Sequence, residues 1–315
     1  MKKIYFVCAL AAMMSAGCAT QGTRSVPDVR DTDPMIVQLS SSARMAFDKG
    51  EVSTATAMYR RALDRARAID NSREIGRNAH NLAACLIQLE DWDEALKLLA
   101  EAERETIRAG GDAGPILLLA AETARLRGDD EKAGALLDRL EQLEISSEMR
   151  GQAYVLRAHL ACDRKDGPRA AAHLTRANGY LKQVESPGLA GSIAAVSGRV
   201  AEMNSQWAEA AAAFDREAAW MKTADRLPEM ARALERAGQN YLKAEQLNKA
   251  ADSFFRSARS WMAQGNYIDA LRVIEQAASL KPEDEASQET MAVIAELFEE
   301  IRRSVEQQQG QVAKP

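Results

Sequence analysis

The sequence predicts an all-α fold of helical hairpins that follow one another along the chain, about seven hairpins or about fourteen helices. Apolar residues make up 46% of the 315 residues and charged residues 28%, a balance typical of globular proteins. Aromatic residues are scarce and alanine is abundant, which favours close packing of helices. Runs of valine, isoleucine and threonine are missing, so no strand is predicted. The strongest indication is a residue pattern that recurs seven times.

The N-terminal residues have the pattern of an export signal. Lys2 and Lys3 precede an apolar stretch, 4–14, which is too short to span a bilayer as a permanent helix. The following residues, Ser-Ala-Gly-Cys at 15–18, resemble the lipobox of bacterial lipoproteins, although Ser15 stands where leucine is usual. The alternatives are an ordinary signal peptide, or a cytosolic protein whose N-terminus is not processed.

The lipobox resemblance implies cleavage before Cys18 and acylation of that cysteine, for example with palmitate. Ala19 follows the cysteine in place of the aspartate that is linked to inner-membrane retention, so the resemblance implies the periplasmic face of the bacterial outer membrane. We therefore expect a signal peptide over 1–17, and a lipidated cysteine with a polar, flexible tether over 18–33.

The recurring pattern is a turn residue followed by a bulky residue at +2, alanine at +5, a bulky residue at +9 and a small residue at +12. Glycine at the turn permits a left-handed conformation, and the alanine permits close approach of two helices. The turn residues are Gly50, Glu90, Gly128, Lys165, Ser205, Glu245 and Gly265. The alanines at +5 are Ala55, Ala95, Ala133, Ala170, Ala210, Ala250 and Ala270. The residues at +12 are Ala62, Ala102, Leu140, Ala177, Glu217, Ser257 and Ala277.

This pattern resembles the tetratricopeptide repeat (TPR), most clearly in copies one, two, six and seven. The resemblance implies a TPR-like α-solenoid over 34–282. Most copies are 37–40 residues apart, whereas the family period is 34, and the last step is only 20. We interpret this last step as a helix over 247–263 shared between two repeats. A capping helix is expected over 283–308, with Ala286, Met291, Ile294, Leu297 and Ile301 facing inward, and a disordered tail over 309–315.

The chain carries no recognisable catalytic motif, and we expect neither an enzyme nor a cofactor. Cys85 and Cys162 are expected to be buried free thiols in different hairpins. His159, Cys162 and Asp163 share one helix face, and His173 could lie level with them, so a zinc site is conceivable. The preferred interpretation is isolated polar residues on a solvated face, with no metal.

Members of the family usually hold peptides or partner helices in a groove lined by the first helix of each hairpin. The Lys/Asn clamp of chaperone-binding members is missing, since Ser40 and Arg44 occupy its positions in the first copy. A slightly basic lining suggests a partner segment with acidic groups or a free carboxylate. The resemblance places these basic residues in the groove: Arg44, Arg77, His80, Arg125, His159, Arg199, Arg232 and Lys243. Glu122, Asp163, Glu202 and Glu235 lie among them.

The preferred function is an outer-membrane-anchored periplasmic scaffold for a protein or peptide partner in envelope biogenesis. Pilus or secretion assembly, outer-membrane protein assembly and the regulation of peptidoglycan enzymes are the processes considered. The formal net charge of −5 argues against a nucleic-acid partner. A metal-dependent envelope enzyme built on the His159 hairpin, and a cytosolic TPR adaptor, remain alternatives.

Overall fold

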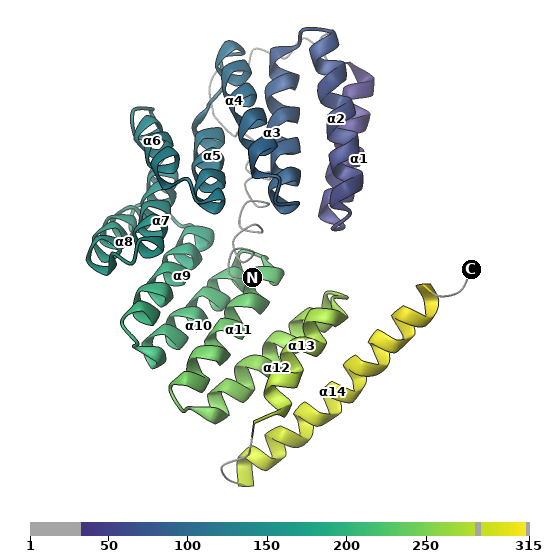
Figure 1. The fold of residues 1–315 in the computed structure, drawn as a ribbon, viewed down its shortest axis with the longest axis vertical. Coiled ribbons are helices and arrows are strands. Elements are labelled where there is room, and N and C mark those ends of the chain that lie inside the picture. Colours follow the sequence, from purple (N-terminus) through teal and green to yellow (C-terminus); the bar gives the residue numbers. More distant parts are fainter. Residues whose placement is uncertain (1–32, 281–284, 313–315) are drawn as a thin grey trace. The chain divides into compact units, whose positions relative to one another are not determined.

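The computed structural model describes residues 33–280 and 285–312, and these residues form fourteen α-helices and no strand (Figure 1). The all-α prediction is therefore confirmed. The expected signal peptide over 1–17, the lipid site Cys18 and most of the tether lie outside the described residues, as does Pro282. Within the described residues, no helix is long and apolar enough to cross a membrane.

The helices separate into two compact units, Met1–Met149 and Arg150–Pro315, with the boundary near the start of α7. In unit 1 the described helices form three hairpins, and each helix packs against the next. These helices are α1 (Pro34–Asp48), α2 (Val52–Ala68), α3 (Ser72–Gln88), α4 (Trp92–Arg108), α5 (Gly114–Arg127) and α6 (Asp130–Glu141).

Unit 2 contains four further hairpins. Tyr154 of the first helix stacks on Tyr180 of the second, with ring centroids 5.8 Å apart, and each later helix packs against its successor. The helices are α7 (Ser147–Asp163), α8 (Gly167–Leu181), α9 (Pro187–Met203), α10 (Trp207–Thr223), α11 (Leu227–Lys243), α12 (Leu247–Ala263), α13 (Tyr267–Ala278) and α14 (Glu285–Val312). We call α7, α9, α11 and α13 the first helices of unit 2.

The turn and alanine positions of the repeat are confirmed. All seven predicted turn residues have positive φ, from 57° at Ser205 to 91° at Gly128. Four of them are not glycine, so those turns adopt the left-handed conformation against the preference of their side chains. The seven alanines at +5 are each 0% exposed, as close helix packing requires. Asp91, Asp129 and Asn266 cap the helices that follow them, by accepting a hydrogen bond from a backbone N–H.

Side-chain size is matched between the two helices of a hairpin. A Cβ atom added to Gly238 of α11 would lie 2.7 Å from Cε1 of Phe254 on α12, and one added to Gly198 of α9 would collide with Phe214 of α10. In hairpin two the residues at the same sequence spacing are Ala83 and Leu99, and leucine is smaller than phenylalanine. In these two hairpins of unit 2 the phenylalanine therefore fits only because the position it packs against is glycine.

The interpretation of the last repeat is wrong in one respect. The helix α12 packs against both α11 and α13, as expected, but α10 likewise packs against α9 and α11. Two neighbours are therefore ordinary for a second helix, and α12 is not also a first helix. The seventh hairpin is α13 with α14, and Gly265 lies between two hairpins. The sequence pattern misled because any helix that begins after a left-handed turn and buries small residues satisfies it.

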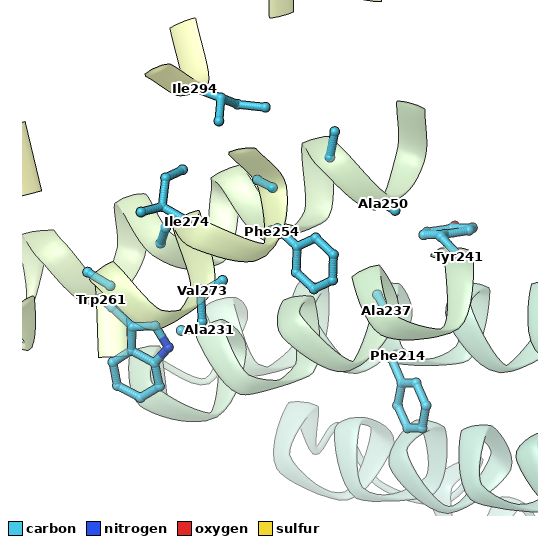
Figure 2. Packing of buried hydrophobic residues seen from close by; sticks show 14 of the residues in the cluster. Phe214, Ala231, Ala237, Tyr241, Ala250, Phe254, Trp261, Val273, Ile274 and Ile294 are labelled. Atoms are coloured by element: carbon cyan, nitrogen blue, oxygen red, sulfur yellow. The ribbon is translucent and has the colours of Figure 1, made fainter. Parts of the chain in front are cut away.

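The helix α14 completes the core of unit 2. Ile294, Leu297 and Ile301 are buried, as expected of the inward face, and Met291 packs against the same cluster. Figure 2 shows that this cluster combines side chains from α10 to α14, with Phe254 among its labelled members. The side chain of Ala286 lies outside the described part of the chain. The helix continues to Val312, into the segment 309–315 for which we expected a tail.

Candidate functional site

Polar contacts connect the first helices of unit 2 to one another. From α9 to α7, Arg199 places Nη1 at 2.6 Å from Nδ1 of His159 and donates from Nη2 to Asp163 at 2.7 Å. The α9 residue Glu202 accepts from Asn240 of α11 at 2.8 Å. Arg272 of α13 donates two hydrogen bonds to the carboxylate of Glu235 on α11, one of them at 3.0 Å. We call the surface that carries these contacts the first-helix face of unit 2.

We had expected His159 on a solvated face. This expectation is wrong, because its side chain is only 2% exposed. Arginine has only donors, so Nδ1 of His159 must accept the hydrogen bond from Arg199 and is engaged with a cation. The His173 ring lies 6.1 Å from the Tyr154 ring, centroid to centroid. Among the described residues, no group of three or more His, Cys, Asp or Glu side chains could hold a metal ion. Cys85 and Cys162 are buried and form no disulfide with each other, as expected.

The other two basic residues predicted for the groove in unit 2 lie beside tryptophans. Lys243 is exposed, and its Nζ is 4.5 Å from the centroid of the Trp207 ring. Arg232 is half-buried, with Cζ 5.5 Å from the centroid of the Trp261 ring. Both contacts have the geometry of cation–π interactions. These side chains are therefore held in place by α10 and α12 respectively.

The unit 1 residues of the predicted groove differ among themselves. Arg44 and Arg77 have side chains that are 60% and 65% exposed, each 3.7–3.9 Å from an acidic group on its own helix. The Arg125 side chain is only 8% exposed, and it donates two hydrogen bonds to Glu122, at 2.7 and 3.0 Å. Arg125 is therefore buried in a pair, where the sequence had suggested an open surface. The reason is that Glu122, three residues earlier, lies on the same side of α5.

His80 is half-buried, and its Nδ1 finds no hydrogen-bond partner within residues 33–280 and 285–312. Burial lowers the pKa of His80 from 6.5 to about 4, because desolvation disfavours the imidazolium. Ser40, which is buried, donates to Asn78 at 2.7 Å, and this hydrogen bond joins α1 to α3. Ser40 is therefore part of the interior of unit 1, whereas His80 is only partly covered.

Sequence reasoning missed a half-buried charge pair in unit 2. Glu217 of α10 and Arg236 of α11 approach to 4.0 Å, and the Arg236 guanidinium lies 3.7 Å from the Phe214 ring centroid. Arg236 is also 3.6 Å from Glu202. Burial lowers the pKa of Arg236, although both carboxylates oppose that effect.

The signal that could have found this pair is a break in the repeat. The other six copies carry an uncharged residue at the +12 position of Glu217, and each of these is 0% exposed. Nine residues before the turn, where the sixth copy has Arg236, copies three to five have apolar side chains. Burial raises the pKa of Glu217 from 4.5 to about 7, despite the opposing charges of Arg236, Arg226 and Arg232. The apolar residues that stand in place of Arg236 in copies three to five are Leu119, Leu156 and Val196.

Comparison with known proteins gives the following matches. Residues 37–104 match the tetratricopeptide repeat family. A search of curated proteins found no significant match. Among solved structures, a signal transduction ATPase with a tetratricopeptide repeat sensor from Pyrococcus horikoshii is 13% identical, with a TM-score of 0.52. That match covers 80% of this chain, and this chain spans only 42% of the ATPase chain.

Two further structures cover more of both chains. A Rap protein in complex with competence and sporulation factor is 14% identical, with a TM-score of 0.58, over 87% of this chain and 76% of that one. NprR in complex with its cognate peptide NprX is 13% identical, with a TM-score of 0.55, over 90% of this chain and 89% of that one. At this level of identity the likeness concerns the fold alone. This chain therefore has the all-α fold of tetratricopeptide repeat proteins, with a match to the repeat family itself over residues 37–104.

Proposed function

We propose that the protein is a scaffold that binds a protein or peptide partner on its first helices. The observation that carries this proposal is the first-helix face of unit 2, where charged side chains are held in fixed positions by contacts between successive helices. A binding surface needs such preorganised polar groups, because ordering them on association costs free energy. The likeness to NprR, which was solved with its cognate peptide, supports a peptide-sized partner.

We further propose that the scaffold is a lipoprotein on the periplasmic face of the outer membrane and serves envelope biogenesis. The support is the sequence alone, namely the export signal and the lipobox resemblance that ends at Cys18. An acyl anchor would keep the scaffold at the membrane where envelope machines assemble. No nucleic acid takes part, in keeping with the negative net charge.

Site-specific photo-crosslinking in intact cells tests the binding face. A crosslinking amino acid replaces Lys243 of α11 or Arg77 of α3, both exposed on first helices. The matched control replaces Arg216, which is exposed on the second helix α10. We expect the same protein of an envelope machine to be captured from the first-helix positions and not from Arg216. Equal capture from Arg216, or capture from none of the positions across growth conditions, would contradict the proposal.

The anchor is tested by intact mass and fractionation. We expect the purified protein to lack residues 1–17 and to carry acyl mass on Cys18, and the Cys18→Ser variant to leave the membrane fraction. A protein that retains Met1 and no added mass would exclude the lipoprotein proposal. It would leave the binding proposal standing, because the crosslinking experiment does not depend on the anchor.

A further inference from the structure

One edge of the Arg232 guanidinium is buried without a partner. The two nitrogens on this edge, Nε and Nη2, are inaccessible to solvent, and neither has a hydrogen-bond partner in the part of the chain that the structure describes. These two N–H groups point in parallel, which is the arrangement that binds both oxygens of a carboxylate. An edge of this kind is costly to bury empty, since each unsatisfied donor loses its hydrogen bond to water.

A third donor of the same kind lies beside it. Trp261 is 4% exposed, and within the described residues its indole Nε1 has no hydrogen-bond partner. The guanidinium of Arg232 lies over the ring of Trp261. A tryptophan N–H can only donate, so α11 and α12 contribute three buried donors without acceptors to the contact between Arg232 and Trp261.

The same region holds one acceptor in the same condition, Oε2 of Glu217, which is buried and has no hydrogen-bond partner among the described residues. The groups facing Glu217 are Arg226, Glu229, Arg232 and Arg236, all from α11 or its N-terminal cap. Arg226 pairs with Glu229 at 2.9 Å, and Arg236 is shared with Glu202 of α9. Glu217 is thus attracted to Arg232 without occupying the free edge of its guanidinium.

We propose that a movement of the half-buried Arg232 side chain opens its guanidinium edge and the indole N–H of Trp261, both closed to solvent here, as a subsite for a carboxylate of the partner, and that Glu217 competes with this carboxylate. The assignment to a partner rests on the proposed function; the subsite itself does not. Glu217 in its charged form repels an incoming carboxylate and holds the arginines, whereas protonated Glu217 does neither. Binding at the subsite is therefore coupled to the uptake of one proton by Glu217.

The coupling has a definite size. Because Glu217 titrates near pH 7, it is mostly protonated at pH 6 and mostly charged at pH 8. If the carboxylate binds only when Glu217 is protonated, the apparent dissociation constant equals the intrinsic constant divided by the protonated fraction of Glu217. That fraction falls roughly tenfold from pH 6 to pH 8. We therefore expect a carboxylate to bind roughly tenfold more weakly at pH 8 than at pH 6.

The test uses sodium acetate as the probe, with sodium chloride at equal ionic strength as the control, on the full chain labelled with ¹⁵N. The indole Nε1–H resonance of Trp261, identified by its loss in Trp261→Phe, reports binding, and the Nε–H resonance of Arg232 reports it independently at pH 6. We expect saturable shifts of both resonances with acetate and none with chloride. The absence of a shift, or the same shift with chloride, would overturn the proposal.

Three variants make the result specific. Arg232→Lys removes the two-nitrogen edge but keeps the charge, and is expected to weaken acetate binding about tenfold or more. Glu217→Gln is expected to bind acetate equally well at pH 6 and pH 8, whereas the exposed control Glu209→Gln should keep the wild-type pH dependence. Acetate binding that survives in Arg232→Lys would refute the subsite, and an unchanged pH dependence in Glu217→Gln would refute the competition.

Two peptides then identify the source of the carboxylate, one with a free C-terminus and no acidic side chain, the other amidated with a single glutamate. Binding of one of them at Trp261 assigns the partner group, whereas binding of neither would overturn the assignment to a partner. If acetate binds at Trp261 but the photo-crosslinking captures no partner, the scaffold proposal is refuted and the carboxylate subsite stands. If a partner is captured but acetate does not bind, only the carboxylate subsite is refuted.

Discussion

Arg199 donates a hydrogen bond from α9 to Nδ1 of His159 on α7, at 2.6 Å, across 40 residues of sequence. The same guanidinium reaches Asp163 one turn further along α7, at 2.7 Å. A single arginine therefore joins the first helices of two successive hairpins, and it does so where His159 is almost completely buried.

Replacing this arginine should loosen that junction. In Arg199→Met, Asp163 and the buried His159 both lose a charged donor, and we expect a loss of about 1–3 kcal/mol in the free energy of unfolding. Urea denaturation measures the loss, and Arg216→Met, at an exposed position of α10, is the control with an expected change within about 0.5 kcal/mol. Equal effects of the two substitutions would mean that the contacts of Arg199 contribute nothing.

The half-buried pair of Glu217 and Arg236 should be strongly coupled. Glu217→Ala leaves Arg236 with only Glu202 as a counter-charge, and Arg236→Leu leaves Glu217 buried near two other arginines, so each single change should cost about 1–3 kcal/mol. The double variant places at both positions the residue types that other copies carry, and we expect it to be close to the wild type or more stable. A double-mutant cycle in urea checks this, and additive costs would contradict it.

His80 predicts how unit 1 responds to acid. Its pKa is about 4 in the folded chain, against about 6.5 when unfolded. Between these values the unfolded chain takes up a proton that the folded chain does not, so stability should fall as the pH drops from 6.5 to 4. The full effect is on the order of 3 kcal/mol. In His80→Gln the stability measured across this range should fall less, and an unchanged pH profile would contradict the prediction.

Glu217 predicts the opposite dependence in unit 2. Its pKa is raised from 4.5 to about 7 in the folded chain, so the folded chain holds a proton that the unfolded chain releases. Its contribution to stability is therefore present below about pH 4.5 and lost as the pH rises towards 7. Glu217→Gln should gain stability relative to the wild type on going from pH 5 to pH 8. Hydrogen exchange of α10 and α11 amides localises the effect, and a gain in the reverse direction would be inconsistent with it.

The glycine–phenylalanine match gives a packing prediction. In Gly238→Ala the new Cβ would lie 2.7 Å from the Phe254 ring, and we expect a loss of about 1–3 kcal/mol. Adding Phe254→Leu recreates the alanine–leucine pair of hairpin two and should recover part of the loss. Gly134→Ala is the control, since its Cβ would meet nothing within 4 Å, and it should gain about 0.5–1 kcal/mol in helix propensity. Thermal denaturation compares the three, and a Gly238→Ala protein as stable as the wild type would exclude the match.

Much of the scaffold could be predicted from the repeat, because its signals are local. The left-handed turns at Glu90 and Lys165 and the buried alanines Ala95 and Ala170 each follow from residues within one hairpin. The candidate site could be predicted less well. Arg199 and Arg232 were placed on the right helix, but nothing in the spacing indicates that one contacts His159 and the other lies over Trp261.

The sequence by itself determined the class of the fold, the positions of its turns and the small residues at its helix contacts, since helical period and turn chemistry act over a few residues. The tertiary structure alone decided that His159 and Arg125 are buried, that α14 completes the seventh hairpin, and that Glu217 meets Arg236. Long charged side chains can bridge neighbouring helices, whose axes lie about 8–10 Å apart. Their partners are therefore set by how one hairpin packs on the next, which the periodicity of a single helix does not record.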